Sequence, residues 1–155
     1  MDVKNKRVVV TGAASGIGKA LCEAFHEADV QSIVAVDMNL DGAQETADSV
    51  NGIAVQANVG IEKDIINVIQ KADEHSGGTD IFCSNAGIGG VPGFFEVEAS
   101  DWQNIWDVNV QSHIFAAKHV LPQMIERGEG YLVNTSSAAG LLTQLGAAGY
   151  SVTKA

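Results

Sequence analysis

The sequence predicts an α/β domain, with a parallel β-sheet covered by helices on both faces. Short β-branched or apolar runs alternate with longer stretches in which apolar residues recur every three or four positions. Strands and helices that alternate in this way form right-handed βαβ units. A glycine-rich turn also separates the first apolar run from the first helical pattern, as such units require. Neither an internal repeat nor a domain boundary interrupts the pattern, so we expect residues 1–155 to form one domain.

The first third of the chain carries three predicted strands and two helices. Arg7–Thr11 (RVVVT) is a β-branched run that ends in glycine, and it reads as a buried strand. The apolar positions of Gly16–Ala28 form a helical stripe. Ser32–Asp37 is the second predicted strand, Leu40–Val50 the second helix, and Ile53–Ala57 the third strand.

The same alternation continues to the last residues. A helix over Ile61–His75 precedes a fourth strand, Asp80–Ser84, and Tyr131–Thr135 forms a fifth. A final helix begins near Ala148. Ligands bind such sheets outside the carboxyl ends of the strands, so the turns after strands one, four and five should share one rim.

A long helix is predicted between the fourth and fifth strands. Ser100 can cap its N-terminus, and Pro122 should bend or end it. Trp102 and Trp106 lie one helical turn apart on this helix. Packing in the core and contact with a partner both fit this pair.

Composition and charge exclude several classes of function. Nine basic and nineteen acidic residues give a net charge of −10, which argues against nucleic-acid partners and anionic membrane surfaces. The N-terminus does not resemble a signal peptide, and no apolar run reaches the length of a membrane span. The spacing of Cys22 and Cys83 indicates buried thiols in a reducing compartment, so we expect a cytoplasmic protein. The four histidines show no spacing typical of a metal site.

The turn after the first strand reads TGAASGIG, residues 11–18. Glycine allows positive φ and close approach of the backbone to a phosphate, and the N–H groups of a helix N-terminus attract anions. We therefore expect this loop to bind the pyrophosphate of a dinucleotide. The spacing is GxxxGxG rather than the more common GxGxxG, and glycines that serve only the turn are the alternative. The candidate cofactor-binding residues here are Gly12, Ser15, Gly16, Ile17 and Gly18.

Asp37 lies at the end of the second predicted strand, nineteen residues after Gly18. An acid about 20 residues beyond the glycine loop can accept hydrogen bonds from a ribose. Met38 and Asn39 follow it, so a 2′-phosphate would meet a carboxylate without a nearby cation. The sequence thus favours NAD over NADP, although an acid that only stabilises the next helix is the alternative reading.

Tyr150 and Lys154 are four residues apart, one turn apart on one face of the last predicted helix. An ammonium beside a phenol stabilises the phenolate, which makes tyrosine a usable acid or base. Alone, such a pair is more often found on a helix surface than in a catalytic site. Ser136 and Ser137 follow the fifth predicted strand, and Asn85 follows the fourth, so all would meet at one rim.

Taken together, these motifs resemble the short-chain dehydrogenase/reductase family, in the same order along the chain. TGAASGIG is similar to the family's TGxxxGIG loop, Asp37 to its acid for NAD, and YSVTK to its YxxxK motif. The remaining matches are Asn58-Val59 at the usual Asp-Val beside adenine, Asn85-Ala86-Gly87 at the NAG motif, Asn109 at the catalytic-site asparagine, and Ser137 in VNTSSAAG.

The resemblance implies both a fold and a set of roles. The fold would be a Rossmann-type doubly wound parallel sheet of five strands in the order 3-2-1-4-5. Tyr150 would be the acid/base, and Lys154 would activate it and hold the nicotinamide ribose. Ser137 would bind the substrate oxygen, and Asn109 would support a water beside Lys154. Residues Asn58, Val59, Asn85, Ala86 and Gly87 would complete the cofactor site, and the reaction would pass hydride between NAD and a secondary alcohol or ketone.

Two departures from the family pattern qualify this expectation. Asn58 replaces an acid, although its amide oxygen could still accept from an adenine amine. The family usually runs to about 250 residues. We therefore expect this chain to be the cofactor-binding part of a seven-stranded fold, weakly active or inactive alone, from a parent that forms homo-oligomers.

Substrate class and alternative functions remain to be considered. Loops Ile88–Phe95 and Leu141–Gly149 are largely apolar, which favours an apolar alcohol or ketone. The main alternative is a dinucleotide-binding module without catalysis. A methyltransferase would have no use for YxxxK. A serine hydrolase would need GxSxG with a later histidine, but GAASG has the wrong spacing and no histidine follows Ser137.

Overall fold

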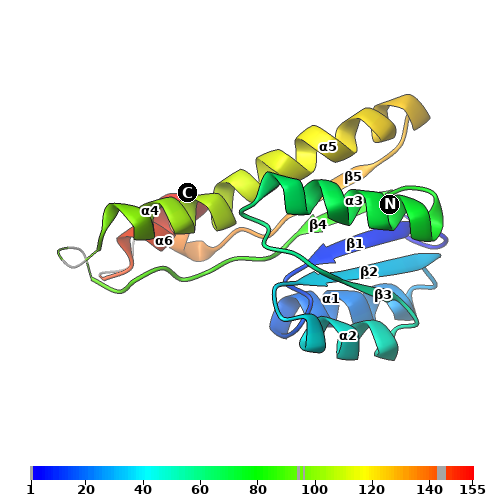
Figure 1. Cartoon of the computed structure of the whole chain (residues 1–155), viewed down its shortest axis with the longest axis horizontal. Helices are drawn as coiled ribbons and strands as arrows, with labels where there is room; N and C mark the ends of the chain where they lie inside the picture. Colours follow the sequence, from blue (N-terminus) through cyan, green and yellow to red (C-terminus); the bar gives the residue numbers. More distant parts are fainter. Residues whose placement is uncertain (1, 94, 96, 143–145) are drawn as a thin grey trace.

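The computed structural model describes residues 2–93, 95, 97–142 and 146–155. Five parallel strands form one sheet in the order β3-β2-β1-β4-β5, which confirms the predicted doubly wound fold (Figure 1). The strands are β1 Arg7–Thr11, β2 Ser32–Asp37, β3 Ile53–Gln56, β4 Ile81–Ser84 and β5 Tyr131–Asn134. Each predicted strand is present, with ends that differ by at most one residue.

Helices cover both faces of the sheet. One face carries α1 and α2, and the other carries α3 and α5 (Figure 1). The helices are α1 Gly16–Glu27, α2 Leu40–Ser49, α3 Glu62–Ser76, α4 Ala99–Trp106, α5 Ser112–Arg127 and α6 Ala148–Lys154. In the described part of the chain none of them is long and apolar enough to cross a membrane.

Alternation along the strands builds two cores. Val9 faces α3 and α5, in one cluster with Val34 and Phe82. Val8 and Val10 point to the opposite face and pack with α1 and α2. Strands buried on both faces read as continuous apolar runs, as RVVVT and SIVAVD do. The edge strand β5 is more exposed, with Tyr131 and Val133 partly in solvent.

The helix predicted between the fourth and fifth strands differs from expectation in three ways. Its N-cap is Glu98, not Ser100, because Glu98 and Asp101 satisfy each other's backbone N–H in a capping box. A π-helical turn, Asp107–Gln111, separates α4 from α5. Pro122 does not end α5, which continues to Arg127. The buried side chains Val120 and Met124, on either side of the proline, hold the helix against the sheet.

An ion-pair network joins the elements at the amino ends of β1 and β4. Arg7 Nε donates to Asp80 Oδ2 at 2.8 Å, and the backbone N–H of Arg7 donates to the same oxygen at 3.0 Å. Arg127 approaches Asp80 from α5. The guanidinium of Arg7 holds the pKa of the Asp80 carboxyl below its ordinary value, mainly through these hydrogen bonds. This rim stabilises the sheet at the end away from the glycine loop.

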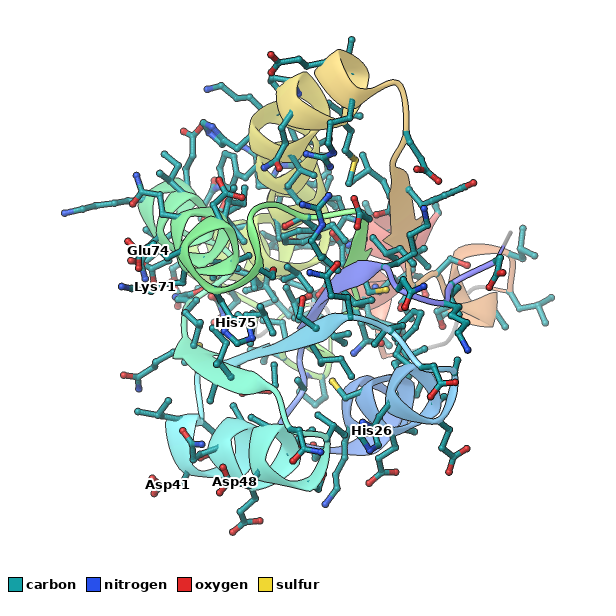
Figure 2. The ribbon with its side chains drawn as sticks, turned by 90° about the vertical axis from the view of Figure 1, so that its right-hand side faces the viewer. His26, Asp41, Asp48, Lys71, Glu74 and His75 are labelled. Atoms are coloured by element: carbon teal, nitrogen blue, oxygen red, sulfur yellow. The ribbon has the colours of Figure 1, made fainter. Side chains whose placement is uncertain are left out.

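Charged and titratable side chains on the outer helices are dispersed. Figure 2 shows His26 on α1, Asp41 and Asp48 near the two ends of α2, and His75 near the C-terminal end of α3 (Figure 2). Lys71 and Glu74 form an exposed ion pair of 2.7 Å on α3. Within the described ranges, no three His, Cys, Asp or Glu side chains gather closely enough to hold a metal ion.

Candidate functional site

The glycine loop between β1 and α1 is tightly packed, both within the loop and against the loop after β4. Gly12 has φ +71°, and a Cβ built on it would lie 3.0 Å from the Cα of Ala86. A Cβ on Gly18 would lie 2.0 Å from the carbonyl oxygen of Gly12. Both positions therefore require glycine. Ser15 precedes α1, and its side chain makes no capping hydrogen bond to the helix.

One hydroxyl joins the loops that follow β1 and β4. Thr11 Oγ1 donates to the carbonyl oxygen of Cys83 at 3.2 Å. It accepts from the backbone N–H of Asn85 at 3.0 Å and from that of Ala86 at 3.1 Å. Asn85 Nδ2 donates to the Thr11 carbonyl, and Asn85 Oδ1 accepts from Thr135 Oγ1, both at 3.0 Å. The ends of three strands are thus held together at one rim.

Asp37 lies at the carboxyl end of β2 and is tied to the glycine loop. Its Oδ2 accepts from the backbone N–H of Ala14, and its Oδ1 from that of Asn39, each at 3.0 Å. Asp37 also borders a cavity of about 150 Å³. The other residues around this cavity are Gly12, Met38, Ala57, Asn58, Val59, Ala86, Gly87, Ile88 and Val108.

Asn58 uses its amide oxygen within its own turn. Oδ1 accepts from the backbone N–H of Gly60 at 3.0 Å, and the backbone N–H of Asn58 donates to Asp64 Oδ2 at 2.9 Å. The expectation that this oxygen serves an adenine amine therefore depends on its second lone pair, because the first accepts from Gly60. The side chain nevertheless borders the same cavity as Asp37.

A second cavity, of about 490 Å³, brings together the two halves of the predicted site. It is bordered by Ser15, Gly16, Ile17 and Gly18 of the glycine loop and by Asn85, Gly87, Ile88 and Gly89 after β4. Thr135, Ser136 and Ser137 after β5 and Tyr150 and Lys154 of α6 complete it. The motifs are far apart in the sequence, yet they share one cavity.

The two candidate serines differ in their surroundings. Ser137 is half-buried, and its Oγ accepts from the backbone N–H of Ala139 at 3.2 Å at the start of a short 3₁₀ turn, Ala138–Gly140. That bond leaves the Ser137 hydroxyl hydrogen free to donate. Ser136 is exposed. Both border the cavity with Tyr150.

Lys154 reaches from the end of α6 to the end of β5. Its Nζ donates to the carbonyl oxygen of Thr135 at 3.0 Å. A Cβ built on Gly87 would lie 3.5 Å from this Nζ, so the ammonium packs beside the loop after β4. Of the residues that the structure describes, no carboxylate lies within 4.0 Å of the ammonium.

Asn109 lies in the π-helical turn and is buried, with 3% of its surface exposed. Its Nδ2 donates to the carbonyl oxygen of Ile88 and to Thr153 Oγ1, both at 3.0 Å, and its Oδ1 accepts from the backbone N–H of Ile88 at 2.9 Å. Both amide hydrogens are therefore engaged, and only Oδ1 keeps a lone pair for a water. π-helical turns are frequent at functional sites.

Two residues near the site were missed by sequence reasoning. Thr153 donates to the carbonyl oxygen of Tyr150 at 3.0 Å and accepts from Asn109. His113 follows the π-helical turn, and burial, then the nearby charge of Lys154, lowers the pKa of its imidazole. Thr153 lies inside the YSVTK motif, so its position was a usable signal. No pattern in the sequence pointed to His113, because its neighbours come from β5 and α6.

The site can be compared with known proteins. A family model described as short chain dehydrogenase matches residues 6–155. An uncharacterized oxidoreductase of Staphylococcus aureus (strain MRSA252) is 33% identical over 97% of this chain and 66% of its own length. Glucose 1-dehydrogenase 2 of Bacillus subtilis (strain 168) is 34% identical over 88% of this chain and 55% of its own length.

A solved structure shows the same arrangement of elements. A short chain dehydrogenase/reductase from Burkholderia phymatum, in complex with NAD, superposes with a TM-score of 0.94 at 28% identity, over 99% of this chain and 57% of that one. The chain belongs to the short-chain dehydrogenase family of oxidoreductases. It spans 55–66% of the length of the two curated relatives named above.

Proposed function

We propose that the protein is an NAD-dependent oxidoreductase that interconverts a secondary alcohol and a ketone. The observation that carries this proposal is the shared cavity, in which Ser137, Tyr150 and Lys154 face the glycine loop. A proton-transfer group and an anion-binding helix N-terminus in one cavity fit a hydride reaction that needs a dinucleotide and a proton.

The residues present fit a dinucleotide. Side chains at Gly12 and Gly18 would collide with backbone atoms, so the turn is compact and lets a phosphate approach the backbone closely. Asp37 lies beside the neighbouring cavity and can accept hydrogen bonds from ribose hydroxyls, because each carboxylate oxygen can accept more than one. A carboxylate at this position favours NAD over NADP, since a 2′-phosphate would meet like charge. The Burkholderia phymatum relative contains NAD.

The chemistry then divides between the cofactor and the chain. Bound nicotinamide supplies or accepts the hydride. Tyr150 donates its phenolic proton to the ketone oxygen in reduction and takes a proton from the alcohol in oxidation. Ser137 donates a hydrogen bond to the same oxygen. Lys154 stabilises the phenolate by its charge, and Asn109 positions the loop after β4 against α6.

The substrate is proposed to be apolar. Ile88 and Gly89 border the cavity, and Leu141 and Leu142 are exposed beyond the 3₁₀ turn, at 90% and 72%. Residues 94 and 143–145 of the loops that the sequence singled out lie outside the described residues. We also propose that residues 1–155 act as one dinucleotide-binding domain of a cytoplasmic homo-oligomer.

The test measures oxidation of NADH in the presence of a panel of apolar ketones. Tyr150→Phe should lower kcat at least about 100-fold and leave NADH binding intact, because only the transferable proton is lost. Tyr131→Phe is the matched control, since Tyr131 lies on β5 and does not border the cavity. Saturable NADH binding without turnover, both by this chain and by a longer chain of the length of its relatives, would instead support a non-catalytic dinucleotide module.

A further inference from the structure

We propose that Thr46 is a positioning residue of the dinucleotide site, which fixes the carboxylate of Asp37 through one peptide unit of the glycine loop. Thr46 lies on α2, is fully buried and borders neither of the two cavities described above. This role rests on the proposed binding of NAD, in which Asp37 accepts hydrogen bonds from a ribose. Thr46 would therefore act on the cofactor without touching it.

Helix α2 approaches the glycine loop at two positions on one of its faces. Gly42 and Thr46 are four residues apart, so they lie one turn apart on the same side of the helix. A Cβ built on Gly42 would lie 2.8 Å from the Cβ of Ala14. Thr46 Oγ1 donates to the carbonyl oxygen of Ala13 at 2.8 Å. The helix is therefore packed directly against residues 13 and 14 of the loop.

The hydroxyl of Thr46 is the hydrogen-bond donor that the Ala13 carbonyl uses. This hydroxyl also lies 3.1 Å from the carbonyl oxygen of Gly42, but it has one hydrogen, and the contact with Ala13 is the shorter of the two. Ala13 is fully buried, and among the residues that the structure describes no other group donates to its carbonyl oxygen. A buried carbonyl without a donor is costly, so Thr46 holds this oxygen in place.

The same peptide unit reaches Asp37 from its other side. The carbonyl of Ala13 and the N–H of Ala14 belong to one planar trans peptide group and point in opposite directions. Thr46 holds the oxygen, and the N–H of Ala14 donates to Asp37 Oδ2 at 3.0 Å. Because the group is planar, a rotation that frees the oxygen also turns the N–H away from Asp37. Thr46 therefore controls a donor that orients the carboxylate.

The carboxylate of Asp37 is held by two backbone N–H groups. Ala14 donates to Oδ2 and Asn39 donates to Oδ1, each at 3.0 Å. With both oxygens held, the plane of the carboxylate is fixed, and each oxygen keeps lone-pair capacity for a ribose hydroxyl. Without the bond from Ala14, the carboxylate could rotate and would have to be ordered when the ribose binds. Thr46 thus contributes to affinity by preorganisation.

A double-mutant cycle tests whether Thr46 acts through Asp37. The dissociation constant for NADH is measured by nicotinamide fluorescence for the unmodified chain, Thr46→Val, Asp37→Ser and the double variant. Thr46→Val removes the hydroxyl at nearly constant shape and should raise the constant about tenfold, the effect of about one hydrogen bond. In the Asp37→Ser background the same change should alter the constant less than about twofold, because the group that Thr46 positions is gone.

Conservative variants separate the hydroxyl from the packing of α2. Thr46→Ser keeps the hydroxyl and should bind NADH nearly as tightly as the unmodified chain. Circular dichroism checks that each variant folds. If Thr46→Val does not fold, Thr46→Ala takes its place in the cycle with Thr46→Ser as its reference, since the two differ only in the hydroxyl, and the same tenfold difference is expected.

Thr79→Val is the matched control. Thr79 is also a fully buried threonine, but within the described part of the chain its Oγ1 has no hydrogen-bond partner. Its replacement should leave the dissociation constant for NADH unchanged. Amide hydrogen exchange of Ala14, followed by NMR without cofactor, should accelerate about tenfold in Thr46→Val and in neither Thr46→Ser nor Thr79→Val.

The outcomes distinguish this proposal from the proposed function. An effect of Thr46→Val that is equally large in the Asp37→Ser background would mean that α2 supports the loop as a whole, and it would overturn the role assigned to Thr46. An unchanged dissociation constant in folded Thr46→Val would do the same, and both results leave dinucleotide binding standing. Failure of the folded, unmodified chain to bind NADH would overturn the proposed function, and the role of Thr46 with it.

Discussion

Asn109 donates a hydrogen bond of 3.0 Å to the hydroxyl of Thr153, and this contact joins the π-helical turn to α6. The two residues are 44 positions apart in the sequence. Thr153 in turn donates to the carbonyl oxygen of Tyr150. The short helix that presents Tyr150 and Lys154 is therefore fixed from the side, which matters because α6 has seven residues and isolated helices of that length are marginal.

Thr153→Val should loosen α6, although the valine side chain has nearly the same shape as that of threonine. The loss of the Asn109 contact leaves a buried donor unpaired and costs about 1–2 kcal/mol locally. Amide hydrogen exchange of residues 148–154 should accelerate roughly tenfold, as measured by NMR or mass spectrometry. Thr153→Ser keeps the hydroxyl and should restore protection. Equal exchange in the two variants would mean that packing, and not this hydrogen bond, holds the helix.

Asp37 should determine the choice between NAD and NADP. Asp37→Ser removes the charge that a 2′-phosphate would meet, and the ratio of the dissociation constants for NADPH and NADH should fall at least about tenfold. Affinity for NADH itself should also decrease, since a ribose acceptor is lost. Asp41→Ser is the control, because Asp41 lies in the first turn of α2 and does not border the cavity. Tighter binding of NADPH than NADH by the unmodified chain would contradict the prediction.

Gly18→Ala should distort the glycine loop. The added methyl group would lie 2.0 Å from the carbonyl oxygen of Gly12, so the turn must open. Overpacking of this kind typically costs about 1–3 kcal/mol, and we expect that loss in urea unfolding together with weaker NADH binding. Gly89→Ala is the matched control. Gly89 borders the same cavity, its φ is ordinary and a Cβ there meets nothing within 4 Å, so the stability of that variant should be unchanged.

The Arg7–Asp80 pair should make the free energy of unfolding depend on pH in the acid range. Hydrogen bonds from Arg7 lower the pKa of Asp80 in the folded protein, so the folded state holds this proton less tightly than the unfolded chain does. The stabilisation is therefore complete above the unfolded pKa, near 4, and disappears as the pH falls through the folded pKa.

The variant Asp80→Asn tests this sign. At neutral pH it should lose about 2–3 kcal/mol in the free energy of unfolding, because Arg7 remains partly buried without a counter-charge. The difference from the unmodified chain should shrink toward pH 2. A difference that stays constant between pH 7 and pH 2 would show that the charge of Asp80 contributes nothing.

Both cysteines should be unreactive in the folded chain. Burial raises the pKa of Cys22 and of Cys83 to about 12, and each side chain is almost completely inaccessible. Alkylation by iodoacetamide at pH 8 should be at least about 100-fold slower than in urea. Glu45→Cys places a thiol on the exposed surface of α2 and should react rapidly under the same conditions, as a positive control. Rapid alkylation of the unmodified folded chain would indicate local opening of the sheet.

Local patterns predicted most of the fold. Short apolar or β-branched runs predicted all five strands. The pattern is clearest in β1, because a strand buried on both faces has no polar positions, as Val8, Val9 and Val10 illustrate. The N-cap of α4 was wrong because Ser100 and Glu98 can both cap, and the reciprocal bond with Asp101 decides between them. Pro122 was expected to bend or end the helix, and it does not end it, because tertiary packing of α5 outweighs a broken backbone hydrogen bond.

The candidate site could be predicted where its residues lie close together in the sequence. Tyr150 and Lys154 share a helix face, so a period of four residues places them together. The π-helical turn at Asp107–Gln111 leaves no periodic signal, and the contact of Asn109 with Thr153 joins distant segments. The sequence also contains no sign of the hydrogen bond that Asn58 Oδ1 accepts from the backbone N–H of Gly60, because it depends on how the backbone turns there.

The contact of Lys154 with a neutral carbonyl has a consequence for how molecules approach. In the described part of the chain its ammonium has no carboxylate within 4.0 Å, so its charge is not cancelled locally. The molecule as a whole carries −10 and repels anions. The ammonium is thus a positive charge on the wall of the cavity in a molecule of opposite net sign, which favours the approach of an anion from that side, and salt at 0.1 M would limit this attraction to about 10 Å.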